Sequence, residues 1–331
     1  MKELIRAMVE IPGPSGYETR IRQAILAQIQ PHVDETRVDA LGNLIALKGA
    51  QNAAGRKIML VAHMDEIGLI ATHIEESGYI RFIAIGGVRP LFSVGGRVRF
   101  LDGLPGVIGH ERQSEASRVP PVDRLFIDIG ARDRKSCPIK VGDVAVFERP
   151  FHELGERLVS KAMDDRVGVA VLVETIHQLS KTPHQLIFVF SAQEEVGLRG
   201  ATAAAFGVDP DLGLAVDVTA TGDTPNGLKM DVSLGRGPAI KIRDEGMLAN
   251  PAVVDWMVKA AQKAKIPYQL EILESGLTDA AAIQLTHAGV PSGCLSIPCR
   301  YIHSQSEMVD FADVQNAVHL LLELLSNPVR V

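Results

Sequence analysis

The chain has 331 residues, of which 46% are hydrophobic and 22% are charged. This composition excludes collagen-like, coiled-coil and intrinsically disordered proteins. At about 150 residues per domain, the length predicts two domains, or one large domain that carries an insertion. The net charge at neutral pH is −6, and no basic segment is present that would bind a phosphate backbone. We therefore expect no nucleic-acid partner.

Hydropathy and cysteine content indicate the compartment. The first residues alternate charged and apolar side chains, unlike a signal peptide. No stretch approaches the roughly 18 consecutive apolar residues of a membrane span. The three cysteines include no Cys-x-x-Cys pair, which argues against a disulfide framework and against a thiolate zinc site. We expect no membrane partner and a cytoplasmic location.

The first 67 residues predict the start of an α/β layer. Residues Glu18–Ile29 place apolar side chains at helical spacing, and Leu44–Leu47 and Ile58–Ala62 are short apolar runs typical of buried strands. From residue 68 to residue 158 the helical period disappears, and short strand-like runs alternate with Gly- and Pro-rich turns. These runs are Tyr79–Ile85, Val98–Leu101, Leu125–Ile129 and Val144–Phe147.

Helical and strand patterns alternate again after residue 158. The expected elements are a helix from Asp164 to Leu179, strands Leu186–Phe190 and Leu212–Val216, a helix after Pro251, a strand Gln269–Leu273 and a helix Asp313–Leu325. We predict an α/β protein. Its mixed-sheet α/β domain, residues 1–67 and 159–331, is interrupted by a small all-β domain, residues 68–158.

Residues that can bind a metal follow four of the apolar runs, and two further carboxylates begin the helix after residue 158. Ligands of open α/β sheets bind outside the carboxyl ends of the strands, so we expect these side chains to meet in one crevice. The candidates are His63 with Asp65, Glu194 with Glu195, Asp217, His303, and the pair Asp164 and Asp165.

Two histidines and several carboxylates, without cysteine, suit zinc, cobalt or manganese at a hydrolytic site. Some of these residues also have simpler interpretations. His63 alone is more typical of a hydrogen-bonded histidine at a strand end, and Asp164 with Asp165 also suits the first turn of a helix. The adjacent Glu194 and Glu195 favour a functional site, because neighbouring carboxylates near a core repel each other unless a cation or proton intervenes.

The order of these residues resembles that of the co-catalytic metallo-aminopeptidases of the tetrahedral type, the glutamyl and deblocking aminopeptidases, some of which are labelled endoglucanases. The resemblance covers nearly the whole chain. Such enzymes often carry Gly-Gly where this chain has Gly276-Leu277. Further matching segments are Pro12–Glu18, Asp39–Leu44, Ala62–Gly68, Lys161–Arg166, Ser191–Gly197, Gly235–Pro238 and Thr278–Ala280.

The resemblance implies two divalent metal ions per subunit, with zinc or cobalt as the expected metal. It implies His63 and Asp217 as ligands of one ion. Glu195 and His303 are the implied ligands of the other ion. Asp164 would bridge the two.

The resemblance also implies an aminopeptidase that removes N-terminal residues from peptides. Glu194 would be the general base for a metal-bridged water. Asp65 would orient the ring of His63 by accepting a hydrogen bond from it. Asp165 and Asp279 receive no role.

Self-association is implied as well, because residues 68–158 are similar to a dimerisation domain and twelve such subunits can enclose a hollow tetrahedron. The alternative among enzymes is a related metal-dependent deacylase or carboxypeptidase. An inactive assembly module is the alternative outside enzymes. A glycosidase is the least favoured, because its pair of carboxylates would not require the histidines. The preferred N-terminal side chain of the substrate stays open.

Overall fold

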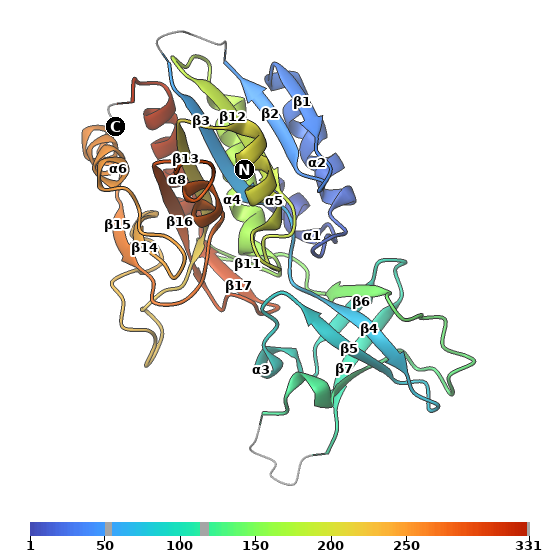
Figure 1. The fold of residues 1–331 in the computed structure, drawn as a ribbon. Coiled ribbons are helices and arrows are strands. Elements are labelled where there is room, and N and C mark those ends of the chain that lie inside the picture. Colours follow the sequence, from blue (N-terminus) through green and yellow to red (C-terminus); the bar gives the residue numbers. More distant parts are fainter. Residues whose placement is uncertain (50–54, 113–118, 330–331) are drawn as a thin grey trace.

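The strands of the described residues form a large mixed sheet and a closed barrel (Figure 1). The computed structural model describes residues 1–49, 55–112 and 119–329. The predicted fold class, a mixed-sheet α/β protein with a small all-β part, is confirmed. No helix within these described ranges is long and apolar enough to cross a membrane.

Four parallel strands form the centre of the large sheet. In spatial order they are β12 (Gln185–Ser191), β3 (Lys57–His63), β13 (Leu212–Thr219) and β16 (Ser292–Arg300). Every residue of β13 is buried, as is typical of parallel strands that are covered on both faces. This strand extends past its predicted end at Val216, so Asp217 lies inside the strand and not beyond it.

Shorter strands extend the sheet on both sides of this centre. On one side lie β2 (Leu44–Lys48) and β1 (Glu35–Val38), both antiparallel to their neighbours. On the other side follow β17 (Glu307–Asp310), β11 (Arg157–Ser160) and β10 (His152–Leu154), again antiparallel. A branch consists of β14 (Ala239–Arg243), which pairs with β16, and β15 (Gln269–Ile272).

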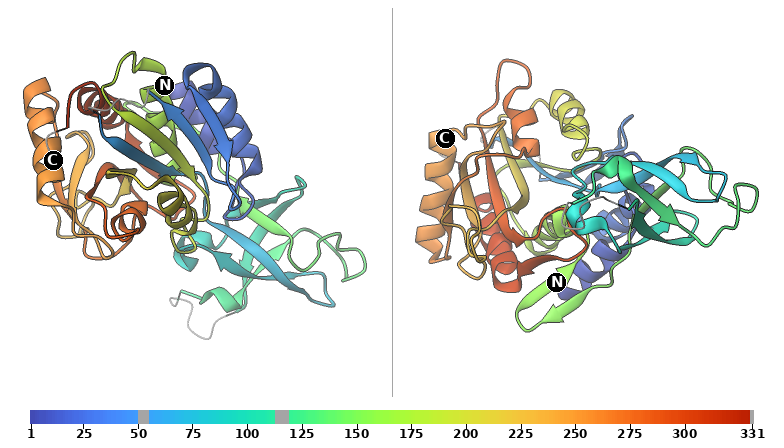
Figure 2. Two further views of the ribbon diagram at one scale, coloured as in Figure 1. Left: turned by 45° about the horizontal axis from the view of Figure 1, so that its top comes forward. Right: turned by 90° about the horizontal axis from the view of Figure 1, so that it is seen from below.

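Helices cover both faces of the sheet (Figure 2). The larger core cluster contains residues of α1 (Lys2–Glu10), α2 (Thr19–Ile29), α4 (Met163–Gln178), α6 (Pro251–Ala264) and α8 (Phe311–Leu325). The smaller cluster contains residues of α5 (Arg199–Val208) and α7 (Asp279–Gln284). The described residues also include the short helical turns η1 (Gln30–His32), α3 (Pro90–Ser93) and η2 (Val122–Arg124).

The barrel lies beyond the end of the large sheet at which β3 leads into β4 (Figures 1 and 2). Its antiparallel strands close in the order β4 (Gly68–Ile74), β5 (Ile80–Ile85), β8 (Leu125–Asp128), β7 (Pro105–His110), β6 (Arg97–Phe100) and β9 (Val144–Phe147). A separate apolar cluster fills it. All six strands fall within residues 68–158, whereas β10 and the start of β11 in the same range pair in the large sheet.

Candidate metal centre

The carboxyl ends of the central strands hold the first group of candidate ligands. His63 is the last residue of β3, and Asp217 lies near the end of the neighbouring strand β13. His63 Nε2 is 4.0 Å from an Asp217 carboxylate oxygen. Asp164, near the start of α4, places its Oδ1 3.0 Å from the same Nε2. These three buried side chains form a group whose ligand atoms lie within 4.8 Å of one another.

A second group shares Asp164 with the first. The other oxygen of this carboxylate, Oδ2, is 3.3 Å from His303 Nε2. Glu195 Oε2 lies 3.3 Å from the same ring nitrogen. The three ligand atoms again fall within 4.8 Å of one another. Each group therefore has one histidine and one carboxylate of its own, and a common carboxylate joins the two groups.

Glu194 and Asp65 lie beside these groups without belonging to either. Glu194 Oε2 is 3.8 Å from His63 Nε2. The Asp65 carboxylate accepts hydrogen bonds from the backbone N–H of Glu194, at 3.0 Å, and of Glu195, at 3.2 Å. One of its oxygens is 3.5 Å from His63 Nδ1, and the Asp65 carbonyl is 3.1 Å from that nitrogen. Asp65 therefore contacts segments that contribute to both groups.

The segment Pro12–Glu18 matches the resembled family but receives no role from the sequence. In the structure it forms hydrogen bonds with Asp65 and with the backbone next to Glu194. Ser15 Oγ donates a hydrogen bond of 2.6 Å to the Asp65 carboxylate. The buried Glu18 carboxylate accepts a hydrogen bond from the backbone N–H of Gln193, one residue before the Glu194–Glu195 pair. The N-terminal loop thus fixes the backbone from which two site carboxylates project.

Three further buried carboxylates around the groups were not assigned a role from the sequence. Glu307 accepts hydrogen bonds from the backbone N–H of His303, at 2.8 Å, and of Asp164, at 2.9 Å. Burial and the neighbouring Asp164 raise its pKa to about 8. Asp165 accepts from the backbone N–H of His63, and Asp279 accepts from the Ser191 hydroxyl. Glu307 lies outside every matching segment, so only its position shortly after His303 could have indicated it.

The electrostatics of the site favour bound cations. Burial raises the pKa of Glu194 and of Asp217 well above the ordinary values, and nearby carboxylates add to this effect. Burial opposes charge on His63 as well, but Glu194 and Asp164 outweigh it and raise the pKa of this imidazole. Among the buried side-chain oxygens of the described residues, Glu195 Oε1 has no hydrogen-bond partner. The three carboxylates and two imidazoles of the two groups are therefore a donor set that two divalent cations would neutralise and satisfy.

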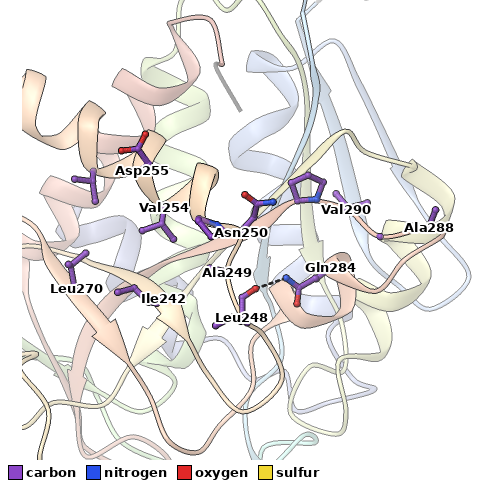
Figure 3. A pocket seen from close by; sticks show the side chains of 14 residues that line it. Ile242, Leu248, Ala249, Asn250, Val254, Asp255, Leu270, Gln284, Ala288 and Val290 are labelled. Carbon is purple, nitrogen blue, oxygen red and sulfur yellow. Dashed lines mark hydrogen bonds between the residues drawn. The ribbon is translucent and has the colours of Figure 1, made fainter.

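An apolar cavity lies elsewhere, between the β14–β15 branch, α6 and α7 (Figure 3). It measures about 820 Å³, and Ile242, Val254 and Leu270 are among its apolar lining residues. None of its lining residues belongs to the two ligand groups. The chemistry of the chain is therefore centred at the strand ends and not at this cavity.

An α/β fold with two histidines and one shared carboxylate at its strand ends defines a candidate metal-binding enzyme, and the comparisons with known proteins identify its family. The chain belongs to the M42 glutamyl aminopeptidase family, whose model matches residues 42–320. The resemblance noted from the sequence is confirmed. Family membership places the chain among the aminopeptidases, which are hydrolases of peptide bonds.

Relatives match over nearly the whole length. A putative aminopeptidase of Acetivibrio thermocellus is 46% identical over 327 residues, covering 98% of each chain. An aminopeptidase structure from the archaeon Desulfurococcus kamchatkensis matches with a TM-score of 0.94 and 42% identity, covering 99% of this chain and 94% of that one. The TET1 peptidase of Pyrococcus horikoshii, which can assemble into a tetrahedron or a large octahedral shell, matches with a TM-score of 0.88 and 35% identity, covering 98% of each.

Proposed function

We propose that the protein is a dinuclear metallo-aminopeptidase that removes N-terminal residues from peptides. One observation carries the proposal: two ligand groups, each with its own histidine, share the carboxylate of Asp164. A carboxylate shared between two groups is the arrangement by which co-catalytic sites hold two ions about 3.5–4 Å apart. Imidazole and carboxylate ligands without thiolate suit zinc or cobalt, in keeping with the sequence-based expectation.

In this proposal His63 and Asp217 would hold one ion, and Glu195 and His303 would hold the other. Asp164 would contribute to both, because its two oxygens face different histidines. When bound, such ions polarise a peptide carbonyl and lower the pKa of water from 15.7 toward about 7. The chain itself must then orient the substrate and move the proton.

Glu194 is the proposed general base, which transfers a proton from the attacking water to the leaving amine. Its carboxylate lies beside His63 but outside both ligand groups, so metal binding leaves its oxygens available. It accepts the proton of the attacking water on a carboxylate oxygen and donates it to the nitrogen of the leaving amine. Asp65 is a positioning residue in this scheme, because it contacts the His63 ring and the backbone of Glu194.

An assay with matched peptides tests the proposal. Purified protein supplied with zinc or cobalt should release the first residue of a free peptide and should leave its N-acetylated form intact. Exhaustive chelation should abolish turnover, and added metal should restore it. Release of acetate or of the C-terminal residue would favour the deacylase or carboxypeptidase alternative. Full turnover in the chelated protein would refute metal dependence.

We also infer that the protein self-associates through the barrel into dimers that build a dodecamer. The similarity to the TET1 peptidase supports this inference. Apolar side chains on the barrel also support it, because Ile83, Leu91 and Val107 are 57%, 65% and 47% exposed. Exposed apolar side chains of this kind gain free energy when a second subunit covers them.

A further inference from the structure

A turn of the barrel, Gly86-Gly87, lies directly against the second ligand group. It follows strand β5, whose last residue is Ile85. A Cβ atom at Gly87 would lie 2.3 Å from Nδ1 and 2.5 Å from Cε1 of the His303 ring. A Cβ atom at Gly86 would lie 2.8 Å from Oε2 and 3.0 Å from Cβ of Glu195. The backbone of the barrel therefore packs on both ligands that are unique to this group.

The loop that carries His303 contacts the barrel at a second point. Gln305, two residues after His303, donates a hydrogen bond from Nε2 to the carbonyl of Phe92, at 3.0 Å. On its other side the loop is held by Glu307, which accepts the His303 backbone N–H. The backbone of His303 has a φ of 62°, in the left-handed region that residues other than glycine rarely adopt. The His303 ring thus lies against the Gly87 backbone of the barrel, and the backbone of His303 is fixed by Glu307 of the large sheet.

We propose that the Gly86-Gly87 turn is a positioning element for the second metal, so that the inserted barrel forms one wall of the metal centre. This inference rests on the proposed dinuclear function. His63 and Asp217, the ligands unique to the first group, lie on β3 and β13 of the large sheet. The Gly86-Gly87 turn therefore acts on the second position, through Glu195 and His303.

The distance between the Gly87 position and the His303 ring decides how strongly a substitution at Gly87 would affect the second metal position. Carbon atoms prefer separations of about 3.5–4.0 Å, so a methyl group at Gly87 would displace the His303 ring by about 1 Å. Metal–ligand distances tolerate deviations of only about 0.2 Å. A single methyl group at this turn is therefore enough to remove His303 from the coordination of an ion.

Gly87 offers a clean test of this steric role. Gly86 has a φ of +74° and needs glycine for its backbone, whereas Gly87 has no such positive φ, so alanine suits its backbone. Gly207, in α5, is the matched control, because it also lacks a positive φ and a Cβ there would meet nothing within 4 Å.

The experiment measures zinc bound per chain at graded free zinc, in the full-length protein. Wild type and Gly207→Ala should each bind two ions tightly, whereas Gly87→Ala should retain one and bind the second at least tenfold more weakly. Two ions bound by Gly87→Ala with wild-type affinity would overturn the inference. Fewer than two ions in the wild type would instead refute the proposed dinuclear function.

A double-mutant cycle separates positioning from general damage to the fold. If Gly87→Ala acts through the His303 ring, it should change neither zinc binding nor thermal stability in a His303→Ala background, where the ring is absent. This comparison stays informative if Gly87→Ala alone is unstable. A loss of stability that persists in the double variant would place the effect elsewhere and overturn the inference.

Discussion

Single residues at the proposed metal centre have three roles: some bind one ion, Asp164 binds both, and Glu194 transfers a proton. His63 and His303 face different oxygens of one carboxylate, Asp164, and this difference separates the two ligand groups. Hydrogen bonds from both histidines hold the pKa of Asp164 below its ordinary value although burial opposes this shift. The residue is thus held as an anion, the form in which a carboxylate binds metal.

Substitution of the adjacent Glu194 and Glu195 should impair the enzyme in different ways, one by loss of turnover and the other by loss of bound metal. Glu194→Gln leaves every proposed ligand in place, so two ions should stay bound while turnover falls by about 10²–10⁴, the usual contribution of a positioned base. Glu195→Gln replaces an anionic ligand with a neutral amide, so metal content should fall and excess metal should restore part of the activity. Metal analysis and turnover of both variants check this. Loss of an ion from Glu194→Gln alone would reverse the two roles.

Ser15 should matter although it touches no proposed ligand. Ser15→Ala removes a hydrogen bond to the buried Asp65 carboxylate, a kind of bond worth about 1.5–3 kcal/mol. We expect kcat to fall about tenfold with KM nearly unchanged, because Asp65 positions residues of the site. Ser15→Thr keeps the hydroxyl and should restore most of the rate. Ser77→Ala, which removes an exposed bond to Glu75, is the control. An unchanged kcat in Ser15→Ala would contradict this role.

The site residues differ in how far the sequence could predict them. The sequence predicts His63, Glu194, Glu195 and Asp217, because polar residues after or near the end of apolar strands lie at one edge of a sheet. The contacts of Glu307 could not be predicted, because they depend on how the His303 loop folds back onto α4. Pairings between segments so distant in sequence leave no periodic signal.

Among the elements, the buried strands and long helices could be predicted, because each has an apolar period of its own. In the sheet branch, β15 is predicted as the strand Gln269–Leu273, whereas β14 shows what the pattern misses. Strand β14 contains Lys241, which is fully buried and donates to Glu271 of β15 at 2.5 Å. A charged residue in a short segment conceals a strand, because its burial becomes acceptable only through its partner on another strand.

This buried pair predicts a large effect on stability. Lys241→Met should lower the free energy of unfolding by about 3–5 kcal/mol, because it leaves the Glu271 carboxylate buried without its cation. Replacing both residues with apolar ones should recover most of the loss. Lys259→Met, which breaks an exposed pair with Asp255, should change it by at most about 1 kcal/mol. Urea denaturation measures all three, and equal losses for the two lysine variants would contradict the prediction.

At the scale of the whole molecule, the insertion begins and ends at the metal centre. The chain leaves the large sheet after His63 and returns through β11 just before Asp164. Lys161 donates to Glu66 at 2.7 Å and joins the two crossing segments. Composition predicts an all-β insertion, but its contact with Glu195 and His303 could not be predicted, because it depends on how segments distant in the sequence meet.

Self-association is expected to depend on the outer surface of the barrel. Ile83→Lys and Val107→Lys place charges on exposed apolar positions of β5 and β7, so particle size should fall because a charged side chain resists burial in an interface. Val38→Lys, on the edge strand β1 of the large sheet, is the control. Light scattering of the three variants checks this. Particles of unchanged size in both barrel variants would count against the barrel as the dimer contact.

Anomalous diffraction from zinc-loaded crystals tests the shared carboxylate most directly. The proposed centre requires two peaks about 3.5–4 Å apart. One should lie between Asp164, His63 and Asp217, and the other between Asp164, Glu195 and His303. A single peak, or two peaks that do not share Asp164, would contradict the dinuclear centre.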